Sequence, residues 1–399
     1  MIQIQPIIDA SFVCPECNTS LLPDRLLWQG IHVCACSKCL NCGATIIDDF
    51  PVGHALFSRF SVNLQKEVLY GGALSRDWFG VPFLKSLIYP KYDVEISFKV
   101  EKFNCADNIV ILNCIDYLYG HALLKLFNAE QYLTNRSVGL VIILPTFLRW
   151  LAPIGTAEIW TIDLPLKNSR NYYPSIDRRI KKECERFRDV YLSKGHPHPK
   201  DVDITKYVKI PKHNFLNKEF RITFVWREDR PWMTGGDSLK ILEKLNKIWL
   251  LTYWQNMKVR LLFKKLRKRI PDATYTVAGL GKASRFPGWI DDQRTDRFTN
   301  KIEQDLCQVY SESRMVIGVH GSNMLLPSAL AGMTIDLMPV NRWGNFAQDI
   351  VFEKQDIRVS AFRYRFVPMN MKRKTIVAII QKMINGYDYF KKQMINISD

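Results

Sequence analysis

The chain has 399 residues, of which 47% are hydrophobic and 12% aromatic, and its formal net charge is +17. This composition excludes a disordered chain and predicts packed globular domains, with room for two domains and a small appendage. The sequence has no run of about 18 apolar residues and no signal-peptide pattern at its N-terminus, so we expect a cytoplasmic protein without a transmembrane helix. The positive charge favours polyanionic partners, namely nucleic acid, an anionic membrane surface or phosphorylated substrates.

A cluster of cysteines marks the N-terminal region. In a cytoplasmic chain such clustering indicates a metal site rather than disulfides. Two Cys-X-X-Cys pairs resemble zinc-ribbon knuckles and predict a closed, structural Zn²⁺ site. We favour four ligands: Cys14, Cys17, Cys39 and Cys42. Cys34 and Cys36 are either bystanders or replace one pair. We expect residues 1–50 to form a zinc-ribbon-like module that depends on the metal to fold, because so short a segment cannot bury a core.

Apolar runs alternate with helical segments in a first series. We predict strands at 109–114, 138–144 and 157–164. We predict helices at 121–133 and, as a basic amphipathic helix, at 175–192. The alternation predicts a parallel α/β sheet in a first domain, residues 51–212.

A second series of the same kind follows. We predict strands at 220–226, 273–278, 315–319 and 334–338. We predict helices over much of 238–269 and at 301–311. The fold class is therefore α/β, with two Rossmann-like doubly wound domains at 51–212 and 213–368, and a C-terminal helix within 369–399.

Three loops follow the carboxyl ends of predicted strands, where ligands bind in such sheets. In the loop at 227–230, Arg227 and Arg230 could clamp a diphosphate, since guanidinium groups match phosphate in bidentate geometry. The alternative is a surface ion-pair cluster with Glu228 and Asp229.

The segment 315–339 reads as strand, glycine loop, helix, glycine turn and strand. A glycine loop before a helix presents free backbone N–H groups, which suit a phosphate. The predicted diphosphate-binding residues of this loop are His320, Gly321, Ser322 and Asn323. The alternative is a scaffold turn without a ligand.

The loop at 116–121 carries the titratable groups of the first domain. Asp116 or His121 could act as a general base for an acceptor hydroxyl. The alternatives are a turn or helix cap for Asp116 and a packed side chain for His121.

A basic segment with apolar interleaving occupies 258–270, and Trp249, Tyr253 and Trp254 lie upstream of it. The segment could lie on an anionic membrane surface, but we favour the solvated face of a domain helix.

At the three loops the chain resembles glycosyltransferase family 61. The run 316–326 looks like that family's strand, His-Gly-Ala/Ser-Gly turn and apolar helix. The run 119–124 is similar to its Gly-His-apolar segment, and 224–230 to its strand that ends in an arginine-bearing loop. The resemblance covers 109–340. The chain departs from the pattern at Asn323, where the family often has glycine, and in its cysteine-rich N-terminus.

The resemblance implies a GT-B architecture, a nucleotide-sugar donor bound mainly by the second domain, inversion at the anomeric carbon and no catalytic metal. It implies that His320, Gly321 and Ser322 hold the donor diphosphate with Arg227 and Arg230. It also implies that His121 or Asp116 faces the acceptor.

These inferences predict a bacterial-type hexosyl- or pentosyltransferase that acts on a glycan or glycolipid in surface polysaccharide biosynthesis. We expect structural Zn²⁺ as the metal, peripheral contact with the inner face of an anionic membrane, and no nucleic-acid partner. The alternatives are a zinc-ribbon nucleic-acid-binding protein, which explains the charge and cysteines but not the loops, and a non-catalytic scaffold of the same fold.

Overall fold

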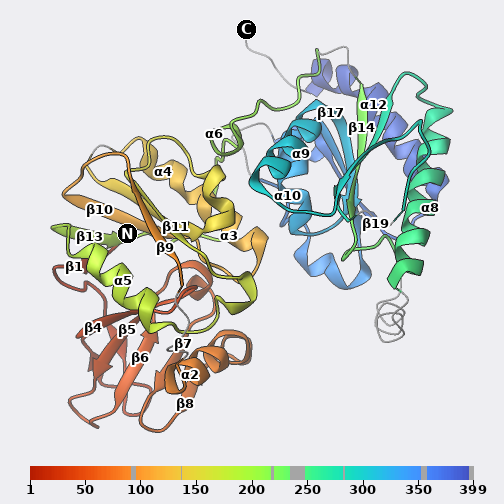
Figure 1. Ribbon diagram of the computed structural model, residues 1–399. Helices are drawn as coiled ribbons and strands as arrows, with labels where there is room; N and C mark the ends of the chain where they lie inside the picture. Colours follow the sequence, from red (N-terminus) through yellow and green to blue (C-terminus); the bar gives the residue numbers. More distant parts are fainter. Residues whose placement is uncertain are drawn as a thin grey trace. The chain divides into compact units, whose positions relative to one another are not determined.

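The computed structural model describes residues 1–90, 96–135, 137–216, 220–233, 248–281, 284–351 and 357–394 (Figure 1). The chain forms two compact units, residues 1–202 and 203–399, each of which is described by itself. Both contain a sheet with parallel strands and flanking helices, which confirms the predicted α/β class.

Unit 2 is built on a six-stranded sheet in which all neighbouring strands are parallel. Its strands are β14 (Arg221–Arg227), β15 (Thr274–Leu280), β16 (Asp291–Thr295), β17 (Ser313–Val319), β18 (Met333–Met338) and β19 (Tyr364–Pro368). The spatial order is β16-β15-β14-β17-β18-β19, which is 3-2-1-4-5-6 counted along the chain. In this order the direction of winding reverses between β14 and β17, so the crevice for a ligand lies at the carboxyl ends of these two strands.

Helices cover both faces of this sheet (Figure 1). One face carries α8 (Ile248–Arg267) and α12 (Arg373–Met394), and the other α9 (Asn300–Glu312) and α10 (Leu325–Leu330). The central strands are buried on both faces, which explains why β17 and β18 are nearly continuous apolar runs.

Unit 1 contains a second six-stranded sheet in the order β1-β13-β10-β11-β12-β9. Its strands are β1 (Ile2–Gln5), β9 (Phe98–Lys102), β10 (Asn108–Asn113), β11 (Gly139–Pro145), β12 (Glu158–Ile162) and β13 (Asp189–Leu192). The middle four strands are parallel and the two edge strands antiparallel. The winding reverses between β13 and β10, so the loop after β10 opens at the crevice of this sheet. Helices α3 (Tyr119–Leu126), α4 (Glu130–Leu133) and α5 (Pro174–Cys184) connect the strands.

A five-stranded antiparallel sheet precedes this α/β part within unit 1. Its strands are β4 (Arg25–Trp28), β5 (Val33–Lys38), β6 (Thr45–Asp49), β7 (Phe60–Asn63) and β8 (Val68–Gly71). The sheet therefore continues past residue 50, where the sequence places the end of the N-terminal module. Its apolar side chains Val33, Ala35 and Ile46 share one core with Ile109 and Val141 of the parallel sheet. The N-terminal region thus buries apolar side chains in a core that it shares with the parallel sheet, contrary to the expectation that only a metal could supply its folding energy.

Several elements differ from the sequence prediction. The helix predicted at 175–192 ends at Cys184, and the last part of that range forms strand β13 in the middle of the sheet. Strands β16 and β19 were not predicted, because β16 has the polar sequence DDQRT and alternating burial is weak in both. Residues 238–247 of the predicted helix lie outside the described residues. Within the described parts of the chain, no helix has the length and apolarity needed to cross a bilayer.

Candidate functional site

The two predicted donor loops of unit 2 meet at the crevice between β14 and β17. Arg230, after β14, donates from Nη1 to the backbone carbonyl of His320, after β17, at 3.2 Å. Gly321 has φ +148°, and a Cβ on this residue would lie 2.2 Å from Arg230 Nη1. Only glycine lets the guanidinium approach the loop backbone this closely. The structure therefore brings Arg230, His320 and Gly321 together as the sequence predicts.

Arg227 takes a different position from Arg230. Its guanidinium forms a bidentate ion pair with Asp229 in its own loop, with distances of 2.8 and 3.0 Å. A second cation is supplied instead by Arg342, on the one-turn helix η7 (Val340–Asn345). Burial and then the charge of Arg342 lower the pKa of Arg230, so the two positive charges are near enough to repel each other. Sequence reasoning missed Arg342 because it lies after β18, outside the three motifs.

Ser322 and Asn323 begin the short helix η6 (Ser322–Met324), which leads into α10. Asn323 Nδ2 donates to the Val319 carbonyl at 3.2 Å, so the side chain closes the turn at the position where the family often has glycine. The Oδ1 atom of Asn323 is buried and has no hydrogen-bond donor among the described residues. This oxygen lies in the loop beside Gly321.

The His320 side chain is buried and is engaged by Asp336. Its Nδ1 donates to Asp336 Oδ2 of β18 at 2.6 Å, and the backbone of Asn345 accepts from the ring as well. His320 is 2% exposed and Asp336 fully buried. The His320 backbone N–H donates to the Leu337 carbonyl at 3.0 Å, so His320 can contribute to an anion site by holding the loop in place rather than through its imidazole.

A buried carboxyl pair completes this network. Asp349 lies 3.6 Å from His320 Nδ1 through its Oδ1. Burial raises the pKa of Asp336 to about 7, and burial together with the charge of Asp336 raises that of Asp349 well above its usual range. Apart from the bond from His320, the carboxylate oxygens have no donor among the described residues, so the pair keeps a proton at neutral pH.

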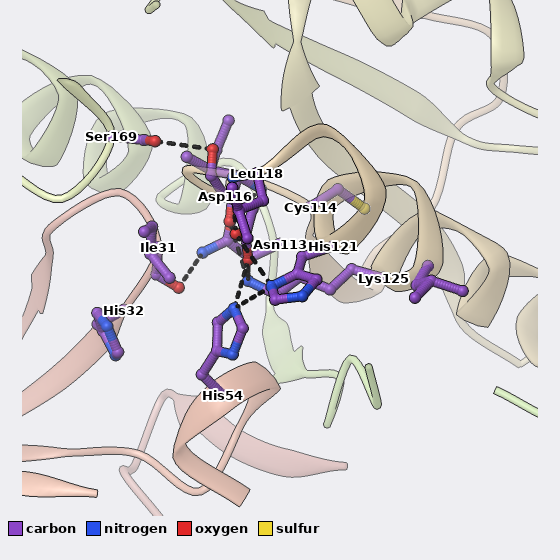
Figure 2. Close-up of polar contacts among 12 residues, drawn as sticks. Ile31, His32, His54, Asn113, Cys114, Asp116, Leu118, His121, Lys125 and Ser169 are labelled. Atoms are coloured by element: carbon purple, nitrogen blue, oxygen red, sulfur yellow. Dashed lines mark hydrogen bonds and ion pairs between the residues drawn. The ribbon is translucent and has the colours of Figure 1, made fainter. Parts of the chain in front are cut away.

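The predicted general-base candidates of unit 1 lie in one cluster at the end of β10 (Figure 2). Asp116 is fully buried, and its carboxylate accepts from His54 Nε2 at 2.8 Å and from Lys125 Nζ at 2.9 Å. The backbone N–H of Leu118 donates to its other oxygen at 3.1 Å. His121 Nδ1 lies 3.2 Å from His54 Nε2 and 3.7 Å from Asp116 Oδ1. Asp116 and His121 are close in the sequence. Two residues from outside their loop, His54 and Lys125, complete the cluster.

The electrostatics separate the roles of these groups. Burial would raise the pKa of Asp116, but the Lys125 ammonium and His54 outweigh it and hold this pKa below its usual range. Asp116 is therefore a fixed anion, and its complete burial keeps it away from an acceptor hydroxyl. Burial lowers the pKa of His121 to about 4, so its imidazole is neutral at pH 7 and can accept a proton. Its side chain is 32% exposed, against 15% for His54 and none for Asp116.

His54 is the member that sequence reasoning missed. It lies on the one-turn helix η1 (Gly53–Leu56), in the connection between β6 and β7 of the antiparallel sheet, and no local pattern links it to Asp116 after β10. Gly53 leaves room for the Lys125 side chain, because a Cβ there would lie 3.0 Å from Lys125 Cε. The ligand atoms of His54, Asp116 and His121 are close enough to hold a metal ion, but the Lys125 ammonium already neutralises Asp116 and opposes a cation.

The four predicted zinc ligands come together in unit 1. The sulfur atoms of Cys14, Cys17, Cys39 and Cys42 all lie within 4.8 Å of one another. The closest pairs, Cys14 with Cys42 and Cys17 with Cys39, are 3.7 and 3.5 Å apart. A tetrahedral Zn²⁺ with bonds of about 2.3 Å places its thiolates about 3.8 Å apart, so the four sulfurs could hold such an ion.

The backbone of each Cys-X-X-Cys pair forms the same turn. Asn18 N–H donates to the Cys14 carbonyl and Gly43 N–H to the Cys39 carbonyl, both at 2.9 Å. Asn18 and Gly43 both adopt positive φ angles, 57° and 73°, which these two residue types tolerate best. The matching turns aim the two pairs of thiols at one point.

Glu16, between the first two cysteines, ties this turn to the hairpin of β7 and β8. It accepts from Lys66 Nζ at 2.6 Å, from Asn63 Nδ2 at 2.8 Å and from the Tyr70 hydroxyl. These contacts, led by that with Lys66, lower the pKa of Glu16 to about 2.

The two cysteines left open by the sequence are not part of the four-sulfur group. Cys34 and Cys36 lie on β5 and point into a buried cluster with Phe60, Phe79 and Phe83. They pack as small apolar side chains in the antiparallel sheet.

Comparisons with known proteins complete the description. No family of known proteins matches the sequence, and no curated protein does. Among solved structures, ADP-heptose LPS heptosyltransferase II of E. coli is 10% identical, with a TM-score of 0.38, over 70% of this chain and 99% of that chain. The dodecameric iron-containing heptosyltransferase TibC, in complex with ADP-D-beta-D-heptose, is 11% identical, with a TM-score of 0.34, over 74% and 81%. UDP-GlcNAc 2-epimerase from Methanocaldococcus jannaschii is 9% identical, with a TM-score of 0.26, over 65% and 67%. These values do not assign the chain an activity.

The four-cysteine cluster predicts a bound metal that stabilises unit 1. The purified chain should contain about one Zn²⁺, and Cys14→Ser should lose it and lower the melting temperature by roughly 5–10 °C. Metal analysis and thermal unfolding measure the two effects. Cys105→Ser, at an exposed cysteine outside the cluster, is the matched control. Equal metal content in Cys14→Ser and the control would contradict the assignment.

The carboxyl pair predicts how the stability of unit 2 depends on pH. The pKa of Asp336 rises from 3.8 to about 7 on folding, so the folded chain keeps a proton that the unfolded chain has already lost in this window. The free energy of unfolding should therefore fall as the pH rises from about 4 to about 7. In Asp349→Asn an amide replaces the protonated carboxyl, and the fall should be smaller by about 2 kcal/mol.

Chemical denaturation at several pH values measures this effect. Asp272→Asn, at an exposed position, is the control for the loss of one carboxylate. If Asp349→Asn and the wild type showed the same pH dependence, the two carboxyls would not share a proton.

Proposed function

We propose that the protein is a GT-B-type glycosyltransferase that moves a sugar from a nucleotide-sugar donor to a hydroxyl of a glycan or glycolipid acceptor. The proposal includes inversion of the anomeric carbon without a catalytic metal, and a role in surface polysaccharide biosynthesis at the cytoplasmic side of the membrane. It also includes the four-cysteine cluster as a structural Zn²⁺ site.

One observation carries the proposal. In unit 2 the two loops that resemble the donor motifs of family 61 meet where the sheet reverses its winding, and Arg230 lies against the backbone of Gly321 there. A diphosphate at this crevice would meet two guanidinium groups and the free N–H groups of a glycine loop. A partly buried arginine beside a second cation is unfavourable unless an anion compensates the two charges, which supports an anion site in this place.

The donor half of the reaction follows from these groups. The acceptor oxygen attacks the anomeric carbon as the bond from that carbon to the diphosphate oxygen breaks, and the nucleoside diphosphate leaves with the electron pair. Arg230, Arg342 and the backbone of the loop at 320–323 would stabilise the charge that grows on the leaving group. A single displacement of this kind inverts the anomeric carbon.

The acceptor half follows from the cluster in unit 1. Neutral His121 would take the proton of the acceptor hydroxyl, since it is the most exposed of the three side chains and its imidazole is unprotonated at pH 7. The Asp116 anion would stabilise the resulting imidazolium. His54 and Lys125 would act as positioning residues, because they hold Asp116 in its buried place.

The donor crevice predicts binding of nucleoside diphosphates. A panel of UDP, GDP, ADP and CDP should include one that raises the melting temperature of the chain, because such a ligand binds only the folded state. Arg230→Ala should weaken this binding by about 10- to 100-fold, the loss of one charge-assisted hydrogen-bond partner. Titration calorimetry with the selected diphosphate measures the change.

Two further variants sharpen this test. Arg227→Ala should have a smaller effect than Arg230→Ala, because Arg227 is paired with Asp229. Arg178→Ala, at an exposed arginine of α5, should have none. Unchanged binding in Arg230→Ala would refute the placement of the donor diphosphate.

The base assignment predicts the activity of His121 variants. His121→Ala should lower kcat by about 10²- to 10⁴-fold without changing the affinity for the diphosphate. His121→Gln should be equally slow, because glutamine keeps the size and polarity of the side chain but cannot take up the proton. In the wild type, activity should stay constant from pH 8 to about 5 and fall below that as His121 becomes protonated. Sugar transfer at the wild-type rate by His121→Gln would exclude His121 as the base.

A further inference from the structure

An exposed tryptophan of unit 1 packs against Tyr117, which in turn packs against the candidate base. Trp78 lies on η2 (Arg76–Gly80), a single π-helical turn between α1 (Ala73–Ser75) and α2 (Val81–Ile88). Such turns are rare in proteins, and those that occur are often found at functional sites. The side chain of Trp78 is 47% exposed, although indole rings usually bury most of their surface.

The turn is anchored by the residue next to Trp78. Phe79 is buried, and its ring packs against His32 and His54 with centroid distances of 4.8 and 5.0 Å. The packing of Phe79 thus anchors the π-helical turn, and Trp78 remains at the surface. The exposure of Trp78 is therefore a feature of a well-packed turn and not of a frayed end.

Tyr117 connects Trp78 to His121. Its ring centroid lies 5.8 Å from Trp78 and 6.2 Å from His121. Arg170 covers the Tyr117 ring at 5.1 Å and donates from Nη1 to the Trp78 carbonyl at 3.2 Å. One arginine thus holds both aromatic residues in place.

We propose that Trp78, with Tyr117 behind it, is the platform on which a sugar ring of the acceptor stacks while one of its hydroxyls faces His121. This inference rests on the proposed function and names the class of acceptor, a pyranoside. A pyranose ring has one face of C–H groups, and an exposed indole offers the electron-rich face and apolar area that such a surface matches. The group that must lose a proton is a hydroxyl on the same ring, so the platform and the base have to be neighbours.

A ligand-detected NMR experiment tests the platform without donor or turnover. Saturation-transfer difference spectra are recorded with the full-length chain and methyl β-D-glucopyranoside, methyl β-D-galactopyranoside and methyl α-D-mannopyranoside as separate probes. We expect at least one of them to show its strongest signals on the ring protons of one face. These signals should persist in Trp78→Phe, which keeps an aromatic plane, and drop at least tenfold in Trp78→Ala.

Two controls make the outcome specific. Trp249→Ala removes an exposed tryptophan of unit 2 and should leave the signals unchanged. Glycerol, a polyol without a ring face, should give no signal that depends on Trp78. Equal pyranoside signals in wild type and Trp78→Ala, or signals that depend on Trp78 with uridine but with none of the pyranosides, would overturn the proposal.

The outcome also separates this inference from the proposed function. If no nucleoside diphosphate binds but the pyranoside signals depend on Trp78, the platform holds and the transferase proposal fails. If a diphosphate binds through Arg230 and the pyranoside signals do not depend on Trp78, the platform alone fails. Once an acceptor is in hand, Trp78→Ala should raise its KM by about 10- to 100-fold and leave the donor KM unchanged, as the loss of a stacking partner predicts.

Discussion

The neutralisation of the buried Asp116 carboxylate is the interaction on which the packing of unit 1 depends. A carboxylate without solvent is costly unless other groups neutralise it and donate hydrogen bonds to it. Here the compensation comes from Lys125 on α3, the N–H of Leu118 at the start of that helix, and His54 in the connection between β6 and β7 of the antiparallel sheet. The two sheets of unit 1 must therefore pack in one way, because any other arrangement leaves a buried anion unpaired. The same arrangement exposes His121 and sets its pKa.

Unit 2 contains similar groups, but they have a different role. A histidine again meets buried carboxyls beneath a loop at the point where the sheet reverses its winding, but the network of His320, Asp336 and Asp349 is closed to solvent. The hydrogen bonds of the His320 imidazole hold the loop in place. What the loop presents is backbone, together with the guanidinium of Arg230. One unit thus offers a proton acceptor and the other a cationic cradle, which is the division of roles that our proposal assigns to acceptor and donor.

Local patterns predicted the parts of this protein that depend on local contacts. Strands β10, β14, β17 and β18 are apolar because both of their faces are covered, and the cysteine turns need only adjacent residues. The edge strand β16 is polar and was missed for that reason. Strand β13 was mistaken for helix because its four residues follow a helical repeat. The roles of His54, Arg342 and Trp78 could not be predicted from the sequence, since each depends on a neighbour that is distant along the chain.

The position of His54 has a consequence for the history of the chain. A cysteine-rich segment beside an α/β domain could be regarded as a module that recombination adds, exchanges or deletes. In this protein such an event would remove His54, which donates to Asp116, and also Gly53, which leaves room for the Lys125 side chain. The segment up to η1 and helix α3 must therefore be inherited together, and substitutions at Gly53 and Lys125 should be correlated across descendants.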